Sequence, residues 1–428
     1  MDIGTLATLV RAVLVIIVVA RLLGLLCRRF GQPEVIGEIV GGILLGPTLF
    51  HGAITQELFP ADIRPALKML STVGICVFMF LVGLHLAHGG LRVQGRIAVA
   101  LSLGSMVVPF VLGTLFAIGI AGDRSGRSAV LFCLFVGTAV SVTAFPVLAR
   151  ILTDRDLIDT PIGGLALATA AVGDVLAWSM LAVLVALSHA STLPWQVLLV
   201  LPFVAILVGV VRPLLARLAQ RTPRTPVRSR AARVSLDAGL AIAIAAALVL
   251  SCAATSWMGL HAIFGAFLLG AVMPRTGAAA LRAYVLPWIE RIDRVVLLPL
   301  FFVVAGFAVN LSGMDSREVG LLLLILLVAI GGKMAGVFGA ARLCRVSARH
   351  SAGLALLINT RGLTELIVLA VGLQIGLLDQ RLYSLMVVMA LVTTLMPGLL
   401  LPFVYPKQGT RERESRAVTP LLERESMP

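Results

Sequence analysis

Charged residues are scarce in this sequence. They make up 13% of its 428 residues, whereas hydrophobic residues make up 59%. A soluble globular chain has about 25% charged and about 45–50% apolar residues. The mean hydropathy is +1.04. This balance excludes an ordinary soluble protein and predicts a polytopic membrane protein.

The sequence also lacks the spacings that mark metal, disulfide or catalytic sites. Its isolated cysteines are Cys27, Cys76, Cys133, Cys252 and Cys344, and its six histidines are scattered. No spacing predicts a metal cluster or a disulfide framework, and neither a phosphate-binding loop nor a nucleophile–base pattern occurs. We therefore expect no enzyme activity, no cofactor, no bound nucleotide and no metal site beyond a transported ion.

The net charge of +14 lies almost entirely in short loops between apolar segments. Cytoplasmic loops of membrane proteins have this character, so we expect no nucleic-acid partner.

The first apolar segment leads directly into the second and has no small-residue cleavage pattern, which argues against a cleaved signal peptide. Windows of about 20 apolar residues predict spans in the bilayer. The 13 spans are expected at 5–27, 33–50, 66–87, 97–120, 128–152, 162–188, 195–219, 236–255, 258–274, 293–311, 318–343, 351–376 and 382–405.

The distribution of basic residues predicts the orientation of these spans. Nineteen arginines lie in odd-numbered loops, against six basic residues in even-numbered loops. The six are Arg64, Lys68, Arg124, Arg127, Arg317 and Arg381. By the positive-inside rule, the N-terminus lies outside and the C-terminus lies in the cytoplasm of a multi-pass cell membrane protein.

A weak internal repeat divides the chain. The segment 78–86 aligns with 301–309 at an offset of 306 − 83 = 223, and the same offset places 137–152 on 360–375. Seven spans separate the aligned segments, so the repeat is inverted, as in many secondary transporters; chance similarity is the alternative. We expect a first half with a linking helix over 1–220, a basic cytoplasmic linker over 221–235, a second half over 236–405 and a short cytoplasmic tail over 406–428. The linker serves either topology and lipid contact or regulatory docking.

Span six carries a carboxylate, Asp174, near its middle. A charged side chain at the bilayer centre costs roughly 2.5–3.5 kcal/mol on insertion scales. Asp174 is therefore either an ion and proton site, which we favour, or a structural partner for a buried cation. Gly173, directly before it, permits close backbone approach.

Span five shows signs of a broken helix. The hydroxyl residues Thr138 and Ser141 precede Pro146, which cannot donate the usual helical hydrogen bond. Helices break within a membrane only where protein or water satisfies the freed backbone groups, and their ends suit ions. A simple proline kink is the alternative.

Span twelve contains a polar stretch from Asn359 to Glu365 that includes Arg361 and Gly362, and this stretch is the repeat counterpart of the span-five break. Arg361 and Glu365 either pair and neutralise each other or take part in an ion site.

Span eleven carries Lys333, one of three lysines in the chain. A buried ammonium, unlike a guanidinium, can lose its proton. Lys333 is therefore either a proton carrier or a counter-charge for a buried carboxylate.

Seven motifs are distributed over about residues 5–405. In chain order they are GQPEVIGEIVGGILLGPTLF, FLVGL, GTAVSVTAFPVLARIL, GDVLAW, GAFLLGAVMP, LPLFFVVAGF and NTRGLTELIVL. In this order they resemble the motifs of the cation:proton antiporter-2 family, which is part of the monovalent cation/proton antiporter superfamily. The last of them is most similar to the plant cation/proton exchangers and a related bacterial branch.

The resemblance implies an all-α integral membrane protein with the sodium/proton antiporter fold: about 13 transmembrane helices, an inverted repeat, two crossing broken helices and a homodimer. It implies that Asp174 is the ion site, that Thr138 and Ser141 lie where the crossing helix approaches it, and that Lys333 assists. Gly173 stands where the family usually has Asn, Asp or Gln, which argues against electrogenic exchange through an acid pair. We expect no nucleotide-binding regulatory domain of the kind found in potassium-efflux relatives.

The expected function is secondary active transport: exchange of a monovalent cation, Na⁺ or K⁺, for protons by alternating access, with a role in pH homeostasis. A bare carboxylate is too costly to carry across the barrier, so a proton or a cation neutralises Asp174 in turn. One carboxylate that exchanges one H⁺ for one M⁺ favours electroneutral transport. The alternatives are a cation channel, a membrane sensor without transport, and an exporter of an organic cation or metabolite on the same fold.

Overall fold

The structure is a computed structural model that describes residues 3–48, 53–88, 95–122, 124–155, 157, 160–188, 199–221, 230–258, 260–273 and 286–404. Within these ranges the chain forms α-helices and two π-helical stretches, and no strand. The predicted tail over 406–428 lies outside the described residues, as do residues 222–229 of the predicted linker. The chain is helical again from Arg230.

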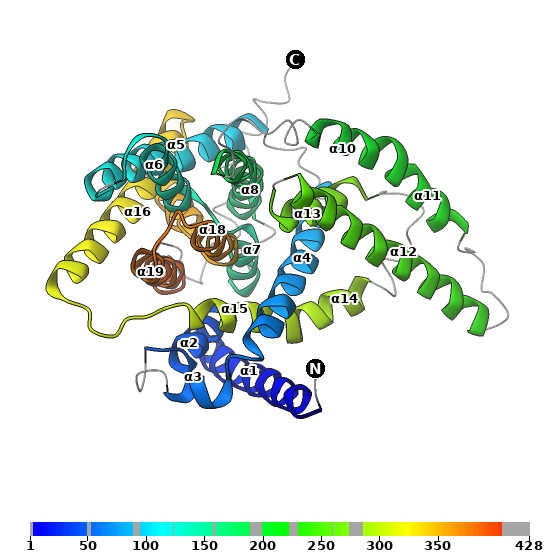
Figure 1. The fold of residues 1–428 in the computed structure, drawn as a ribbon. Coiled ribbons are helices and arrows are strands. Elements are labelled where there is room, and N and C mark those ends of the chain that lie inside the picture. The colour runs from blue at the N-terminus through cyan, green and yellow to red at the C-terminus, as the bar shows by residue number, and fades with distance from the viewer. Residues whose placement is uncertain are drawn as a thin grey trace, which may run out of the picture. The chain divides into compact units, whose positions relative to one another are not determined.

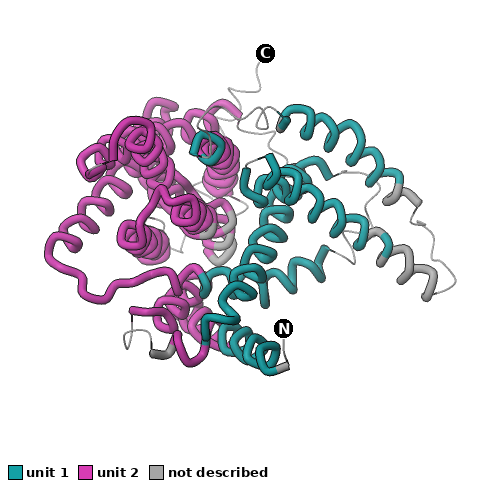
Figure 2. The backbone as a smooth tube through the Cα atoms, in the orientation of Figure 1, with its two compact units in different colours: residues 1–17, 59–89, 185–304 teal, residues 18–58, 90–184, 305–428 magenta. Residues whose placement is uncertain are grey.

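The chain divides into two compact units, which Figure 2 colours separately. Unit 1 comprises residues 1–17, 59–89 and 185–304. Its helices are α4 (Arg64–His88), α10 (Val200–Ile206), the π-helical η2 (Leu207–Val211), α11 (Arg212–Arg221), α12 (Arg230–Trp257), α13 (Ala262–Val272), α14 (Leu286–Ile292) and the π-helical η4 (Asp293–Leu297). It also holds the start of α1 (Ile3–Arg29) and most of α15 (Leu298–Phe307).

Unit 2 comprises residues 18–58, 90–184 and 305–428. Its helices are α2 (Glu34–Leu45), α3 (Ala53–Leu58), α5 (Gly95–Ile120), α6 (Gly126–Ser141), α7 (Phe145–Asp154), most of α8 (Pro161–Ser188), α16 (Ser316–Leu343), α17 (Ala348–Ile358), α18 (Leu363–Gln374) and α19 (Gln380–Val404). Within this unit α5 packs between α6 and α16, and α18 contacts α6, α7 and α19 (Figure 1).

Each of the 13 predicted spans coincides with one helix or with consecutive helices. Six described helices are individually long and apolar enough to cross a membrane, and shorter apolar helices include α6, α13 and part of α18. Two predicted spans are interrupted: α6 is followed by α7 in span five, and α17 by α18 in span twelve. The all-helical class and the two broken helices are therefore as predicted.

Small residues allow the helices of each unit to approach closely. In unit 2, a β-carbon added at Gly104 would lie 2.6 Å from the carbonyl oxygen of Gly336, so α5 and α16 are in backbone contact. In unit 1, a β-carbon at Gly83 would lie 2.8 Å from the backbone nitrogen of Ala271, where α4 meets α13. Lipid provides little hydrophobic drive for helix association, so such close packing holds membrane helices together.

The helix that carries Lys333 has a well-defined start. The Asp315 carboxylate accepts a 2.7 Å hydrogen bond from the backbone N–H of Glu318, and the Glu318 side chain accepts from the backbone N–H of Asp315. This capping box satisfies donors that a helix N-terminus leaves free. The helix then runs for 28 residues, which places the buried Lys333 beyond its midpoint, far from either end.

Candidate functional site

The break in span five lies just before Pro146. Helix α6 ends at Ser141, Val142 is extended with φ −63° and ψ 145°, and α7 begins at Phe145. Pro146 is therefore the second residue of α7, where a backbone N–H would have no partner within the helix. The proline consequently fits the start of the second half-helix, and the residues that leave helical geometry are 142–144.

The break in span twelve depends on a glycine. Helix α17 ends at Ile358, Asn359 follows as its C-cap, and α18 begins after Gly362. Gly362 has φ 147°, a conformation that side chains with a β-carbon rarely adopt. The backbone N–H of Ala144 donates a 3.1 Å hydrogen bond to the carbonyl of Thr360. The two broken segments thus cross in direct backbone contact.

Two buried cations cover the C-terminal end of α6. The Lys333 ammonium donates to the carbonyls of Ser141 and, at 2.9 Å, Val142. The Arg361 guanidinium donates to the carbonyl of Ala139 at 3.2 Å and to that of Val140. Four successive carbonyls therefore have charged donors, although a broken helix would otherwise leave several of them unpaired at the negative end of its dipole.

Arg361 also forms an ion pair with Glu365. The guanidinium Nη1 lies 3.0 Å from the carboxylate Oε1, and both side chains are fully buried. Glu365 is in the first turn of α18, where the helix dipole favours a negative charge. The predicted pairing of these two residues is present, but Arg361 does more than neutralise Glu365, because it also binds the end of α6.

Asp174 is buried in α8, with 1% of its surface exposed. The backbone N–H of Phe145, the first residue of α7, donates a hydrogen bond to its carboxylate. Oδ1 of Asp174 has no hydrogen-bond partner among the described residues. Asp174 therefore lies at the positive end of the second half-helix with one oxygen available for a proton or a cation.

Lys333 is close enough to Asp174 for their charges to interact. In the described part of the chain, however, the ammonium makes its hydrogen bonds to α6 carbonyls and forms no ion pair with Asp174. Removing or adding a charge at Asp174 would therefore leave the hydrogen bonds of Lys333 in place.

Gly173 leaves room beside Asp174. A β-carbon added there would meet only one atom within 4 Å, the hydroxyl oxygen of Ser102 on α5, at 3.4 Å. The hydroxyls of Ser102 and Thr169 are buried and lack hydrogen-bond partners among the described residues. Sequence reasoning missed both residues because a serine or threonine in a membrane helix is common, and the packing of α5 on α8 carries no local signal.

The predicted ligands Thr138 and Ser141 are buried in α6, and both hydroxyls donate within their own helix. Thr138 donates to the Leu134 carbonyl at 2.7 Å, and Ser141 donates to the Thr138 carbonyl at 2.8 Å. The structure gives neither hydroxyl a hydrogen bond to Asp174. Instead, the backbone carbonyl of Ser141 accepts a hydrogen bond from the Lys333 ammonium.

Buried acidic and basic groups in unit 2 thus gather where the two broken helices cross. The cluster comprises Asp174, Lys333, Arg361 and Glu365 and is defined here as the crossing cluster. With all four groups ionised its net charge is zero. Proton or cation binding at Asp174 would raise that charge by one unit.

Comparison with known proteins supports a transport role for this fold. Residues 14–406 match the family described as "Sodium/hydrogen exchanger, transmembrane". The chain is 37% identical over 413 residues to the Na⁺/H⁺ antiporter NhaS4 of Synechocystis sp., an alignment that covers 95% of this chain and 99% of that protein. It is also 37% identical over 436 residues to Cation/H⁺ antiporter 17 of Arabidopsis thaliana, covering 96% of this chain and 51% of that protein.

A third relative is the K⁺/H⁺ antiporter 1 of Saccharomyces cerevisiae, which is 31% identical over 417 residues, 93% of this chain and 48% of that protein. The chain therefore spans nearly all of the cyanobacterial relative and about half the length of the plant and yeast relatives. The solved structure of the sodium proton antiporter MjNhaP1 from Methanocaldococcus jannaschii matches with a TM-score of 0.63 at 17% identity. That match covers 94% of this chain and 98% of the other.

The structural match confirms the predicted sodium/proton antiporter fold. The family match and the cyanobacterial relative confirm the predicted kinship, which the motifs in spans two to twelve indicate. The chain belongs to the sodium/hydrogen exchanger family of transmembrane proteins.

Proposed function

We propose that this protein is a secondary active transporter that exchanges a monovalent cation for protons, with Asp174 as the group that both ions occupy in turn. The observation that carries this proposal is the buried carboxylate of Asp174, whose Oδ1 has no partner among the described residues. The names of the relatives, which include Na⁺/H⁺ and K⁺/H⁺ antiporters, support the same exchange.

Neutralisation of Asp174 explains the coupling between the two ions. An unpaired carboxylate in a low-dielectric interior is costly, so the site favours a state in which a proton or a cation is bound. A proton and a metal ion cannot occupy the same oxygen together. Their competition links the flux of one to the counterflux of the other, provided that the loaded site is exposed alternately to each side.

The crossing cluster supports an electroneutral exchange. Lys333 is held by carbonyls of α6 and forms no ion pair with Asp174 in the structure, so the ammonium can remain charged while Asp174 exchanges one H⁺ for one cation. Thr138, Ser141 and Gly173 are proposed to border the ion, and Arg361 and Glu365 to compensate charge. Pro146, Asn359 and Gly362 are proposed to maintain the helix breaks. 

A proteoliposome assay tests the proposal. Purified protein is reconstituted with a pH-sensitive dye in the lumen, and Na⁺, K⁺, Li⁺ or choline is added outside. We expect Na⁺ or K⁺ to drive a luminal pH change in the wild type and Asp174→Asn to abolish it. The matched control is Asp293→Asn, because Asp293 is also a buried aspartate but belongs to unit 1.

Two results would contradict this function. Undiminished cation-driven pH change in a folded Asp174→Asn protein would remove Asp174 from the ion path. Conductance without proton counterflow would instead indicate a channel. One-for-one exchange moves no net charge, so we expect equal flux with and without an imposed membrane potential. Transport of one net charge would instead couple to the potential by about 2.3 kcal/mol per 100 mV.

We also propose a cell membrane location with the N-terminus outside and the C-terminus in the cytoplasm, on the basis of the loop charges. A fluorescent protein fused to the C-terminus should remain protected from protease added outside intact cells. Digestion of the fused domain under those conditions would show that the C-terminus lies outside, opposite to the proposed orientation.

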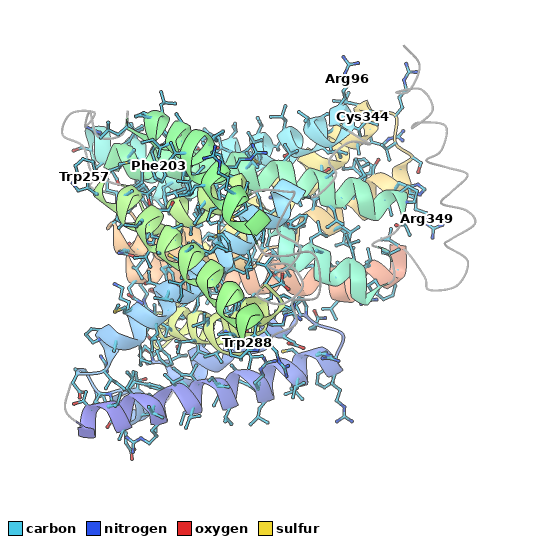
Figure 3. The ribbon with its side chains drawn as sticks, turned by 90° about the vertical axis from the view of Figure 1, so that its right-hand side faces the viewer. Arg96, Phe203, Trp257, Trp288, Cys344 and Arg349 are labelled. Carbon is cyan, nitrogen blue, oxygen red and sulfur yellow. The ribbon has the colours of Figure 1, made fainter. Side chains whose placement is uncertain are left out.

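A homodimer completes the proposal. Unit 1 exposes large apolar side chains, among them Leu201, Ile206, Val249 and Trp257, and Figure 3 shows Trp257 and Trp288 at its surface. Such faces suit lipid or a second copy of the chain. Light scattering of the detergent-solubilised protein should give twice the chain mass of 45.1 kDa. A protein mass equal to that of a single chain would refute the dimer.

A further inference from the structure

Three buried oxygen atoms of unit 2 come from two helices and have no hydrogen-bond partner among the described residues. They are Oγ of Ser102 on α5, and Oγ1 of Thr169 and Oδ1 of Asp174 on α8. Each of the three residues has at most 1% of its surface exposed. Buried polar atoms are normally paired, because an unsatisfied one is costly. Three of them together point to a ligand with which they interact.

The packing of α5 on α8 brings the Ser102 hydroxyl next to Asp174. A β-carbon added at Gly173 would lie 3.4 Å from Oγ of Ser102, its only contact within 4 Å outside its own stretch of helix. Gly173 directly precedes Asp174, and consecutive Cα atoms are about 3.8 Å apart. The missing side chain of Gly173 therefore leaves space between the helices where the hydroxyl approaches the residue that bears the carboxylate.

The second hydroxyl belongs to the same helix interface. Thr169 lies four residues before Gly173, so the two residues share one face of α8. One turn towards the start of both helices, Ala98 of α5 and Ala170 of α8 belong to a single buried apolar cluster. This packing fixes the two helices on one side of Gly173, so the hydroxyls are presented by rigid elements.

We propose that Ser102 and Thr169 bind the transported cation together with Asp174 and set the affinity of the site for a metal ion. This inference rests on the exchange at Asp174 proposed above. A monovalent cation inside a membrane protein is held by oxygen atoms that replace its hydration shell, and two hydroxyls with one carboxylate supply three of them. The ligand class is a partly dehydrated alkali-metal ion. Choline does not fit, because methyl groups surround its charge.

The two hydroxyls distinguish the metal ion from the proton. A proton bonds to one carboxylate oxygen, whereas a metal ion interacts with several oxygens at once. Removing one hydroxyl therefore weakens the binding of the cation and leaves the protonation of Asp174 in place. The expected result is a higher half-saturating cation concentration with the maximal exchange rate retained.

The proteoliposome assay tests this split, with the initial rate of luminal pH change measured against the concentration of Na⁺ or K⁺. Ser102→Ala and Thr169→Val should each raise the half-saturating concentration about tenfold, which corresponds to about 1.4 kcal/mol. Ser102→Thr retains a hydroxyl and should keep the wild-type value. The matched control is Ser105→Ala, because Ser105 is also a buried serine of α5 but its hydroxyl donates to the Ser102 carbonyl at 2.8 Å.

Thermal unfolding in detergent measures the binding without transport. NaCl or KCl replaces choline chloride at constant ionic strength, and a cation that binds the folded protein raises its melting temperature. Ser102→Ala should need about ten times more of the cation than the wild type for the same rise. Ser105→Ala should follow the wild-type curve.

Unchanged half-saturation in Ser102→Ala and Thr169→Val, with Asp174→Asn inactive, would overturn this inference and leave the proposed function standing. Exchange retained in Asp174→Asn would overturn both. An equal rise in Ser105→Ala would assign the effect to helix packing, and a wild type whose melting temperature responds to no alkali-metal ion would contradict the binding itself. Ser102→Ala decides the question if Thr169→Val fails to fold.

Discussion

Replacing Arg361 by methionine removes a buried guanidinium that has two kinds of partner. It pairs with the Glu365 carboxylate at 3.0 Å, and it donates to the carbonyls of Ala139 and Val140 at the end of α6. Replacing Glu365 by leucine removes the other half of the same ion pair. If only the ion pair mattered, the two substitutions would destabilise the protein by similar amounts.

The structure predicts unequal effects. In Arg361→Met, the Glu365 carboxylate loses its cation, which costs about 3–5 kcal/mol for a buried pair. Two carbonyls also lose their donor, at about 1–3 kcal/mol for each unsatisfied group. In Glu365→Leu, the guanidinium keeps both α6 carbonyls, so that loss is avoided. We expect Arg361→Met to be the more destabilising by about 2–6 kcal/mol.

The double variant separates the two contributions. Arg361→Met with Glu365→Leu removes the unpaired carboxylate but leaves the Ala139 and Val140 carbonyls without a charged donor. It should therefore recover part of the loss caused by Arg361→Met, and the loss that remains relative to the wild type reports the two carbonyls. Such coupling between neighbours is what a double-mutant cycle measures.

Equilibrium unfolding in mixed micelles, with SDS titrated against a mild detergent and tryptophan fluorescence as the readout, gives the three free-energy differences. Equal destabilisation by the two single variants would refute a separate role for the α6 carbonyls. A double variant as stable as the wild type would refute it too, since the two carbonyls would then have lost their donor at no cost.

Three further predictions concern the same unit. Gly362→Ala should destabilise by at least about 1–3 kcal/mol, because φ is 147° and the new β-carbon would lie 2.8 Å from a valine methyl of α7. Its control, Gly164→Ala, meets no atom within 4 Å and should be neutral or stabilising in the same micelle titration. Lys333→Arg should keep exchange insensitive to an imposed potential, because a guanidinium does not release a proton; a potential dependence present only in the wild type would make Lys333 a proton carrier. Gly173→Asn should fold with near wild-type stability, since its β-carbon would meet only the Ser102 hydroxyl at 3.4 Å; an unfolded variant would contradict the open space there.

The fold was predictable because hydropathy and helix-breaking residues are local features of the sequence. Apolar length marks the spans, and the polar residues near Pro146 and Gly362 mark the two breaks. The residues at which the helices end and begin at the two breaks were harder to predict. The helices before the breaks end 358 − 141 = 217 residues apart, and those after the breaks begin 363 − 145 = 218 residues apart. The sequence offset of 223 therefore misaligns the repeat here by a turn or more of helix.

The buried charged residues of the crossing cluster stand out in the sequence, but their hydrogen bonds do not. An isolated acid or lysine in an apolar run stands out, which is why Asp174 and Lys333 are visible in the sequence. The choice of partner for each depends on three-dimensional packing between helices distant in the chain. Hence pattern analysis foresaw neither the binding of Lys333 to α6 carbonyls nor the position of Ser102 beside Gly173.

Helix ends, more than pairwise salt bridges, organise the charges of the crossing cluster. Each end carries roughly half an elementary charge. The carboxylate of Asp174 accepts from the first N–H of α7, and the ammonium of Lys333 donates to the last carbonyls of α6. A site built on a buried Lys333–Asp174 ion pair would have to break that pair in every cycle, at about 3–5 kcal/mol. Here Asp174 and Lys333 each have a backbone partner, so the proposed change of ion at Asp174 would leave the contacts of Lys333 and of the helix break in place.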